Sequence, residues 1–116
     1  DLSEPDDQRL ALRWLGILRG QLPEVGLACT SGVHSGSEII KALLVGADVA
    51  CTASAILRRG PEAVAVMLAE AERWMTAHEY TGVAQLRGSM SAASVEDSSA
   101  YERAQYQAVL HSGRYA

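Results

Sequence analysis

The apolar positions of the chain follow helical spacing in three stretches and form short continuous runs in two others. Bulky apolar residues recur every three or four positions over residues 10–19, 36–46 and 60–75, which predicts three amphipathic helices. Residues 25–30 and 47–53 are runs of small and β-branched residues, which are typical of short buried strands. The pattern therefore predicts the order helix, strand, helix, strand, helix.

Residues that start and stop helices mark the ends of these elements. Ser35 and Glu38 match a capping box, in which each side chain accepts a hydrogen bond from the other residue's free backbone N–H. Gly46 supplies the stop of that helix, and Pro61 is suited to the first turn of the next. Ser3 is a candidate cap for the first helix. These signals place the second helix between the two strands.

Two strands separated by a helix predict a parallel pair, because the helix must carry the chain back before the next parallel strand begins. Neither strand alternates cleanly between apolar and polar residues, so we expect both to be buried on both faces. A two-stranded sheet with helices on one side leaves its other face and both edges uncovered. We therefore expect this segment to need more protein, either the rest of a longer polypeptide of which it is the C-terminal part or another copy of the chain.

The hydrophobic pattern weakens after Tyr80. Residues 82–99 are rich in serine, alanine and glycine and predict a loop or a short helix, and residues 101–110 predict a last helix. We expect one unit over residues 1–116, of which residues 81–116 form a helical or irregular C-terminal extension.

Each predicted strand ends in a turn of small residues, Ser31-Gly32 after the first and Ala53-Ser54 after the second. Backbone N–H groups at helix N-termini accept phosphate readily, and β/α barrels recurrently bind phosphate at the loops after strands seven and eight. The turns therefore predict a phosphate-binding corner of a β/α barrel; the alternative is that they only connect strand to helix. A complete barrel takes about 250 residues, so 116 residues supply at most about half of one.

Composition narrows the classes of partner. Fourteen acidic and ten basic side chains give a net charge of −4, with no basic stripe to favour nucleic acid. No apolar run approaches the roughly 18 residues of a membrane span. Two cysteines in a chain whose first residues are acidic favour reduced thiols and a cytoplasmic location.

The remaining candidates for chemistry have ordinary structural explanations. Cys29 and Cys51 lie in apolar strands and are expected to be small buried side chains. His34 follows the first strand and either faces solvent beside the helix cap or contacts a cofactor. Arg58-Arg59 lie just past the second strand, where their charge could assist a phosphate; we expect them to be a solvated pair at the start of a helix. The cysteines and histidines show no metal-ligand spacing.

The chain resembles the C-terminal region of dihydroorotate dehydrogenases, and is most similar to their bacterial "dihydroorotate dehydrogenase-like" branch. The resemblance covers nearly the whole chain, and the run from Gln85 to Ser91 is its more specific part. It is carried by residues 28–34, 39–49, 54–62, 74–75, 78–80, 85–91 and 101–106. It implies an α/β fold, namely strands 7–8 and helices 6–8 of a TIM (β/α)8 barrel that binds flavin mononucleotide (FMN) and is incomplete on its own.

The resemblance also implies a cofactor site. The family's Gly-Gly turn falls on Ser31-Gly32 and its Gly-Thr or Gly-Ser turn on Ala53-Ser54. Ser31, Gly32, Val33, Ala53 and Ser54 would then bind the FMN phosphate, chiefly through backbone N–H groups. Both first positions depart from glycine, which weakens binding if the backbone there needs positive φ. No equivalent of the family's catalytic base is recognisable, so no catalytic residue is assigned and the isolated chain is expected to be inactive.

Three functions follow. The first is a fragment of an FMN-dependent oxidoreductase that oxidises dihydroorotate to orotate in pyrimidine biosynthesis, for which this chain supplies the flavin phosphate corner. The second is the same corner in a β/α-barrel enzyme that binds a phosphorylated substrate without flavin. The third is a non-catalytic module that pairs with a partner chain through its open strands.

Overall fold

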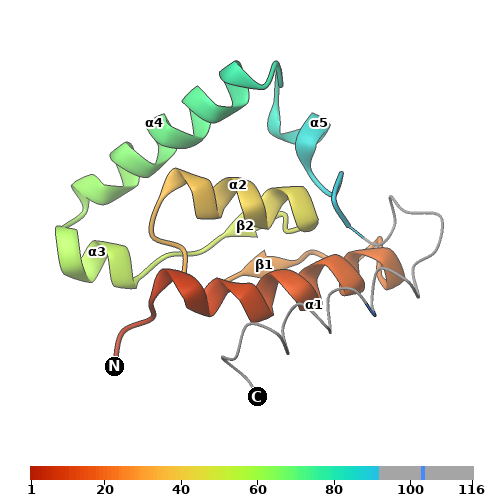
Figure 1. The fold of residues 1–116 in the computed structure, drawn as a ribbon, viewed down its shortest axis with the longest axis horizontal. Coiled ribbons are helices and arrows are strands. Elements are labelled where there is room, and N and C mark those ends of the chain that lie inside the picture. Colours follow the sequence, from red (N-terminus) through yellow and green to blue (C-terminus); the bar gives the residue numbers. More distant parts are fainter. Residues whose placement is uncertain (92–102, 104–116) are drawn as a thin grey trace.

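The protein is a helix-dominated α/β unit built around two short parallel strands (Figure 1). The computed structural model describes residues 1–91 and Arg103. The helix predicted over 101–110 and most of the extension predicted over 81–116 therefore lie outside the described residues. The elements are η1 (Pro5–Asp7), α1 (Gln8–Gln21), β1 (Ala28–Cys29), α2 (Gly36–Val45), β2 (Val49–Ala50), α3 (Ser54–Arg59), α4 (Glu62–Ala77) and α5 (Val83–Leu86).

The two strands form the parallel pair that the sequence predicts. Ala28 lies opposite Val49 and Cys29 opposite Ala50, and α2 connects the two strands. Each strand is only two residues long, against six and seven predicted. Beyond the strands, the N–H of Cys51 donates to the carbonyl of Cys29 and the N–H of Asp48 donates to the carbonyl of Leu27, each at 2.7 Å. The residues before Leu27 do not extend the pairing with β2; the carbonyls of Pro23 and Val25 accept hydrogen bonds from Arg19 instead.

The sheet is covered on one face only, so the expectation of strands buried on both faces is wrong. Cys29 is 1% exposed and belongs to the main core, whereas Ala28 is exposed and Val49 is 53% exposed. The small, unpatterned residues of the strands predict burial, but the described residues supply a single layer of helices. Within the part of the chain that the structure describes, one face of the sheet is consequently open to solvent.

The helices agree with the predicted order, with one addition. A six-residue helix, α3, begins directly after β2 and ends at Gly60, where φ is +87°. Arg58 and Arg59 therefore occupy the last turn of a helix, not its start as predicted. Gly46 ends α2 at φ +121°, as predicted, and α5 falls within the stretch predicted as loop or short helix.

The core lies between the helices and the covered face of the sheet. α2 and α4 cross closely at Gly36, where an added Cβ would lie 2.4 Å from Glu70 Cβ and 2.5 Å from Ala71 N. Trp14 lies at helical spacing with the apolar residues of α1, which favours the core, yet it is 49% exposed, and the guanidinium of Arg13 lies 4.4 Å from the centre of its ring. The buried residues of the main cluster are Leu15, Cys29, Val33, Ala42, Ala47, Ala55, Ala63 and Met67.

Arg19 joins α1 to the starts of both strands. Its Nε donates to the carbonyl of Gly46 at 2.8 Å, and its Nη1 donates to the carbonyls of Pro23 and Val25, each at 3.1 Å. Its Nη2 donates to the carboxylate of Asp48 at 2.6 Å. The bonds to Gly46 and Asp48 are partly buried and those to Pro23 and Val25 are exposed; together they fix the end of the sheet opposite the two turns.

No helix in the described part of the chain is both long and apolar enough to cross a membrane.

Candidate functional site

The turns after the two strands line a single small cavity. Its volume is about 220 Å³, and all five residues predicted to bind phosphate contribute to its wall. The carboxyl ends of the two strands are adjacent, which brings positions 22 residues apart in sequence to one point. The lining consists of Ser3, Thr30, Ser31, Gly32, Val33, Cys51, Thr52, Ala53 and Ser54.

A side-chain hydrogen bond fixes the two turns relative to each other. The hydroxyl of Thr52, just after β2, donates to the carbonyl of Val33, just after β1, at 2.7 Å. Val33 is 3% exposed and belongs to the main core. The cavity therefore sits on a rigid base, which keeps its backbone groups in a fixed arrangement.

The first turn has a left-handed backbone at two consecutive residues. The φ angle is +79° at Ser31 and +76° at Gly32, whereas Ala53 in the second turn has φ −133°. The backbone of Ala53 therefore does not require glycine, whereas Ser31 adopts a conformation that favours glycine. Of the first residues of the two turns, Ser31 alone has a strained backbone.

Position 32 requires glycine for two reasons: its φ angle is positive, and a side chain there would clash with neighbouring atoms. A Cβ at this position would lie 2.5 Å from the backbone nitrogen of Gln8 and 2.9 Å from the carbonyl oxygen of Pro5. Gln8 is itself fixed, because its buried side-chain amide donates to the carbonyl of Glu38 at 2.7 Å. The start of α1 thus packs directly against the first turn.

Ser3 belongs to this site, although the sequence interpretation made it a helix cap. Its hydroxyl lies 2.8 Å from the hydroxyl of Ser54 and accepts a hydrogen bond from the N–H of Gly32 at 3.3 Å. The caps of η1 and α1 are instead Glu4 and Asp7. The Ser3–Ser54 contact joins residues 51 positions apart, so no local pattern predicts it.

The charged side chains near the cavity are engaged with each other and not with its interior. Arg58 forms an ion pair with Glu4 at 2.7 Å, and Arg58 holds the pKa of the Glu4 carboxyl below its usual value. Arg59 donates to the carbonyl of His34. None of these four residues lines the cavity. Its polar character comes from backbone groups and hydroxyls.

The N-terminus of α2 is not available to an anion in this structure. The hydroxyl of Ser35 bonds to the carboxylate of Glu38, so the predicted reciprocal capping of backbone N–H groups does not occur. The N–H of Gly36 points to the carboxylate of Glu70, with a nitrogen–oxygen distance of 3.4 Å. Two carboxylates thus lie near this helix start, and any phosphate would depend on the turns themselves.

The two thiols differ in their surroundings. Cys29 is buried as predicted, and burial raises the pKa of its thiol. Cys51 is exposed and lines the cavity, so its predicted burial is wrong. It lies on the sheet face that none of the described helices covers. Among the described residues, no three histidine, cysteine or acidic side chains are grouped in a way that could hold a metal ion.

No protein-family model matches the chain, and a search of curated proteins found no significant match.

Proposed function

We propose that the cavity between the two turns holds the phosphate group of FMN, and that the chain is the flavin-phosphate corner of a dihydroorotate dehydrogenase-like oxidoreductase. The observation that carries the proposal is the convergence of Ser31-Gly32 and Ala53-Ser54 on one cavity. These are the positions that the family resemblance assigns to the phosphate.

The chemistry of the cavity suits an anion. Its lining contains no carboxylate, although the chain as a whole carries a net charge of −4. The N–H of Gly32 and the hydroxyls of Ser3 and Ser54 converge there. The N–H of Gly32 donates to the neutral Ser3 hydroxyl in this structure, and a phosphate oxygen would replace that hydroxyl as its acceptor. At about 220 Å³ the cavity is smaller than a typical pocket of about 300–1,000 Å³ for a whole small molecule. It suits the phosphate end of the cofactor, with the rest of the molecule outside.

The residues of this chain bind and orient the cofactor and do no more. In the intact enzyme the bound FMN supplies the ring that accepts a hydride as dihydroorotate becomes orotate. Gly32, Ser54 and Ser3 would anchor its phosphate, and the Thr52–Val33 bond would keep the two turns in register. No residue at the cavity is placed to remove a proton from a substrate, so the isolated chain is expected to show no turnover.

The open sheet face supports the further proposal that this unit is the C-terminal portion of a TIM barrel. Two parallel strands with helices on one face match the wall of such a barrel, whose interior face is covered by the remaining strands. The rest of the barrel would therefore be the principal partner of this chain, in a cytoplasmic enzyme.

Comparing FMN with riboflavin, which lacks the phosphate, tests the proposal. We expect the chain to quench FMN fluorescence with an affinity at least tenfold above that for riboflavin. Ser54→Ala is expected to weaken FMN binding about tenfold, because it removes a hydrogen bond to a charged group. Ser37→Ala, at an exposed position of α2, is the matched control and should leave the affinity unchanged.

Two results would contradict the proposal in different ways. Equal affinity for FMN and riboflavin would show that the phosphate is not recognised. Competition by inorganic phosphate or a sugar phosphate, without any binding of FMN, would favour the second function, a phosphate site in a barrel that uses no flavin.

A further inference from the structure

The N-terminal segment places an oxygen atom of its own in the cavity between the two turns. The hydroxyl oxygen of Ser3 lies 2.8 Å from the hydroxyl of Ser54, and it accepts the N–H of Gly32 at 3.3 Å. Because a hydroxyl oxygen has two lone pairs, Ser3 can accept from both groups at once. One atom of the chain therefore meets two donors that a phosphate oxygen would use, and it holds the place of such an oxygen.

The next residue of this segment forms a charged contact with the same helix. The guanidinium of Arg58 contacts both carboxylate oxygens of Glu4, with Nη2–Oε1 at 2.7 Å and Nη1–Oε2 at 3.4 Å. Arg58 follows Ser54 by about one turn of α3, so the two side chains lie on the same helix face. Residues 3–4 thus lie along that face and supply one acceptor to each of its two polar groups.

The contact between Arg58 and Glu4 is open to exchange. The two side chains are 38% and 59% exposed, and an ion pair this exposed adds little to stability. A guanidinium fork binds two phosphate oxygens in the same way as two carboxylate oxygens. A phosphate monoester carries a charge of about −1.5 to −2 near neutral pH, which exceeds that of one carboxylate. Phosphate can therefore replace Glu4 at Arg58 and keep the geometry of the fork.

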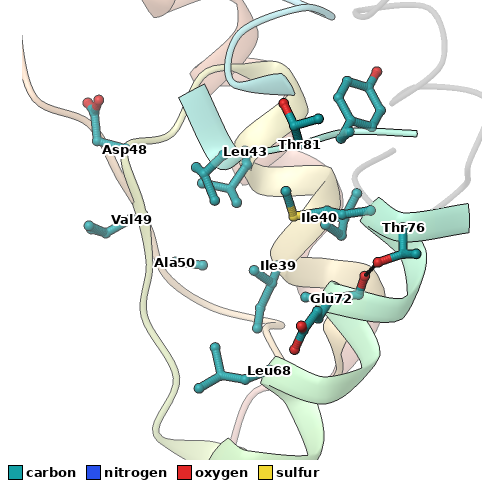
Figure 2. Close-up of a pocket in the computed structure, with 14 residues that line it drawn as sticks. Ile39, Ile40, Leu43, Asp48, Val49, Ala50, Leu68, Glu72, Thr76 and Thr81 are labelled. Atoms are coloured by element: carbon teal, nitrogen blue, oxygen red, sulfur yellow. Dashed lines mark hydrogen bonds between the residues drawn. The ribbon is translucent and has the colours of Figure 1, made fainter. Parts of the chain in front are cut away.

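The larger groove beside β2 does not compete for an anion. It has a volume of about 550 Å³, and the carboxylates of Asp48 and Glu72 lie on its wall (Figure 2). It borders the open edge of β2, where the next strand of the proposed barrel would pair, so the barrel accounts for its filling. Among the described residues that form the wall of the smaller cavity, none is acidic. An anion is therefore favoured at the cavity.

We propose that Arg58 is the charged residue of the phosphate site, and that Ser3 and Glu4 occupy the donors of this site until phosphate takes their place. A phosphate oxygen replaces the Ser3 hydroxyl as the acceptor of the Gly32 N–H, and that hydroxyl then donates its own hydrogen to the phosphate. The guanidinium of Arg58 exchanges the carboxylate of Glu4 for the phosphate, and Glu4 turns to solvent. The inference rests on the proposed phosphate site, to which it adds a positive charge and a competing segment of the chain.

Titration of the nitrogen-15-labelled chain with inorganic phosphate tests the exchange. We expect the side-chain Nε–H signal of Arg58 to shift with the same dissociation constant as the amide signals of Gly32 and Ser54. Glu4→Gln removes the competing carboxylate and should tighten phosphate binding about fivefold. Glu24→Gln changes the net charge equally at an exposed position outside the cavity wall, and it should leave the dissociation constant unchanged.

Variants of Arg58 separate exchange from simple charge repulsion. Arg58→Gln should weaken phosphate binding about fivefold, whereas Arg73→Gln, at an exposed position of α4, is the matched control and should not. If Glu4 competes by holding Arg58, Glu4→Gln should give no gain in a chain that also carries Arg58→Gln.

The outcomes distinguish the failure of this inference from the failure of the phosphate site. Shifts at Gly32 and Ser54 with one dissociation constant in the wild type, Glu4→Gln and Arg58→Gln would overturn the exchange and leave the phosphate site standing. A gain from Glu4→Gln that persists without Arg58 would also overturn the exchange, because Glu4 would then act by repulsion alone. Unmoved signals at Gly32 and Ser54 in every variant would overturn both proposals.

Discussion

Replacing Ser31 with glycine removes a side chain from a residue that has φ +79°. A residue with a Cβ costs about 1–2 kcal/mol in the left-handed region, and glycine avoids this cost. The greater freedom of glycine in the unfolded chain offsets about 0.5–1 kcal/mol of the gain. We therefore expect Ser31→Gly to raise the free energy of unfolding by about 0.5–1 kcal/mol, or the melting temperature by about 2–6 °C.

Ala53→Gly is the matched control, because it changes the first residue of the other turn, where φ is −133°. Only the unfolded-state effect applies there, so we expect a loss of about 0.5–1 kcal/mol. Urea unfolding followed by far-ultraviolet circular dichroism measures both variants. If Ser31→Gly destabilises the chain as much as Ala53→Gly does, the backbone of Ser31 is not strained and the described turn is incorrect.

Two further predictions concern stability. Gly36→Ala should lower the free energy of unfolding by about 1–3 kcal/mol, because the added Cβ would overlap Glu70. Gly26→Ala is the control and should change this free energy by less than about 0.5 kcal/mol, since no atom lies within 4 Å of the added Cβ. Equal urea midpoints for the two variants would contradict the close crossing of α2 and α4. The pKa of Asp48 is lowered, first by the N–H of Leu27, so Asp48 stabilises the fold above its unfolded pKa of about 3.9 and loses this effect as the pH falls through the lower folded pKa. Asp48→Asn should therefore flatten the loss of stability between about pH 5 and pH 2, and an unchanged pH profile in urea unfolding would contradict it.

The order of elements and the parallel pairing could be predicted because they depend on local signals. Helical spacing identifies α1, α2 and α4, and Gly46 ends α2 as the sequence predicts. The start of β1 could not be predicted, since the carbonyls of Pro23 and Val25 are bonded to Arg19 of α1, and no local pattern reveals this tertiary contact. The helix α3 was missed because six residues are too few to establish a hydrophobic period.

The candidate site was only partly predictable. The two turns follow from the strand order, because parallel strands end at the same edge of a sheet. Ser3 contributes to the site because its hydroxyl contacts that of Ser54. The N–H of Gly36 at the start of α2 is not free for a ligand because it donates to the carboxylate of Glu70 in α4. Both are tertiary contacts between distant positions. The exposure of Cys51 was missed because a run of small apolar residues does not reveal which face of a sheet stays uncovered.

A titration of the nitrogen-15-labelled chain with inorganic phosphate tests most directly whether the two turns form one anion site. We predict that the amide signals of Gly32 and Ser54 shift together with a single dissociation constant. The amide of Gly36 should stay in place, because the carboxylate of Glu70 already accepts its hydrogen bond. Unmoved signals at Gly32 and Ser54, or a larger shift at Gly36 than at either turn, would contradict the account.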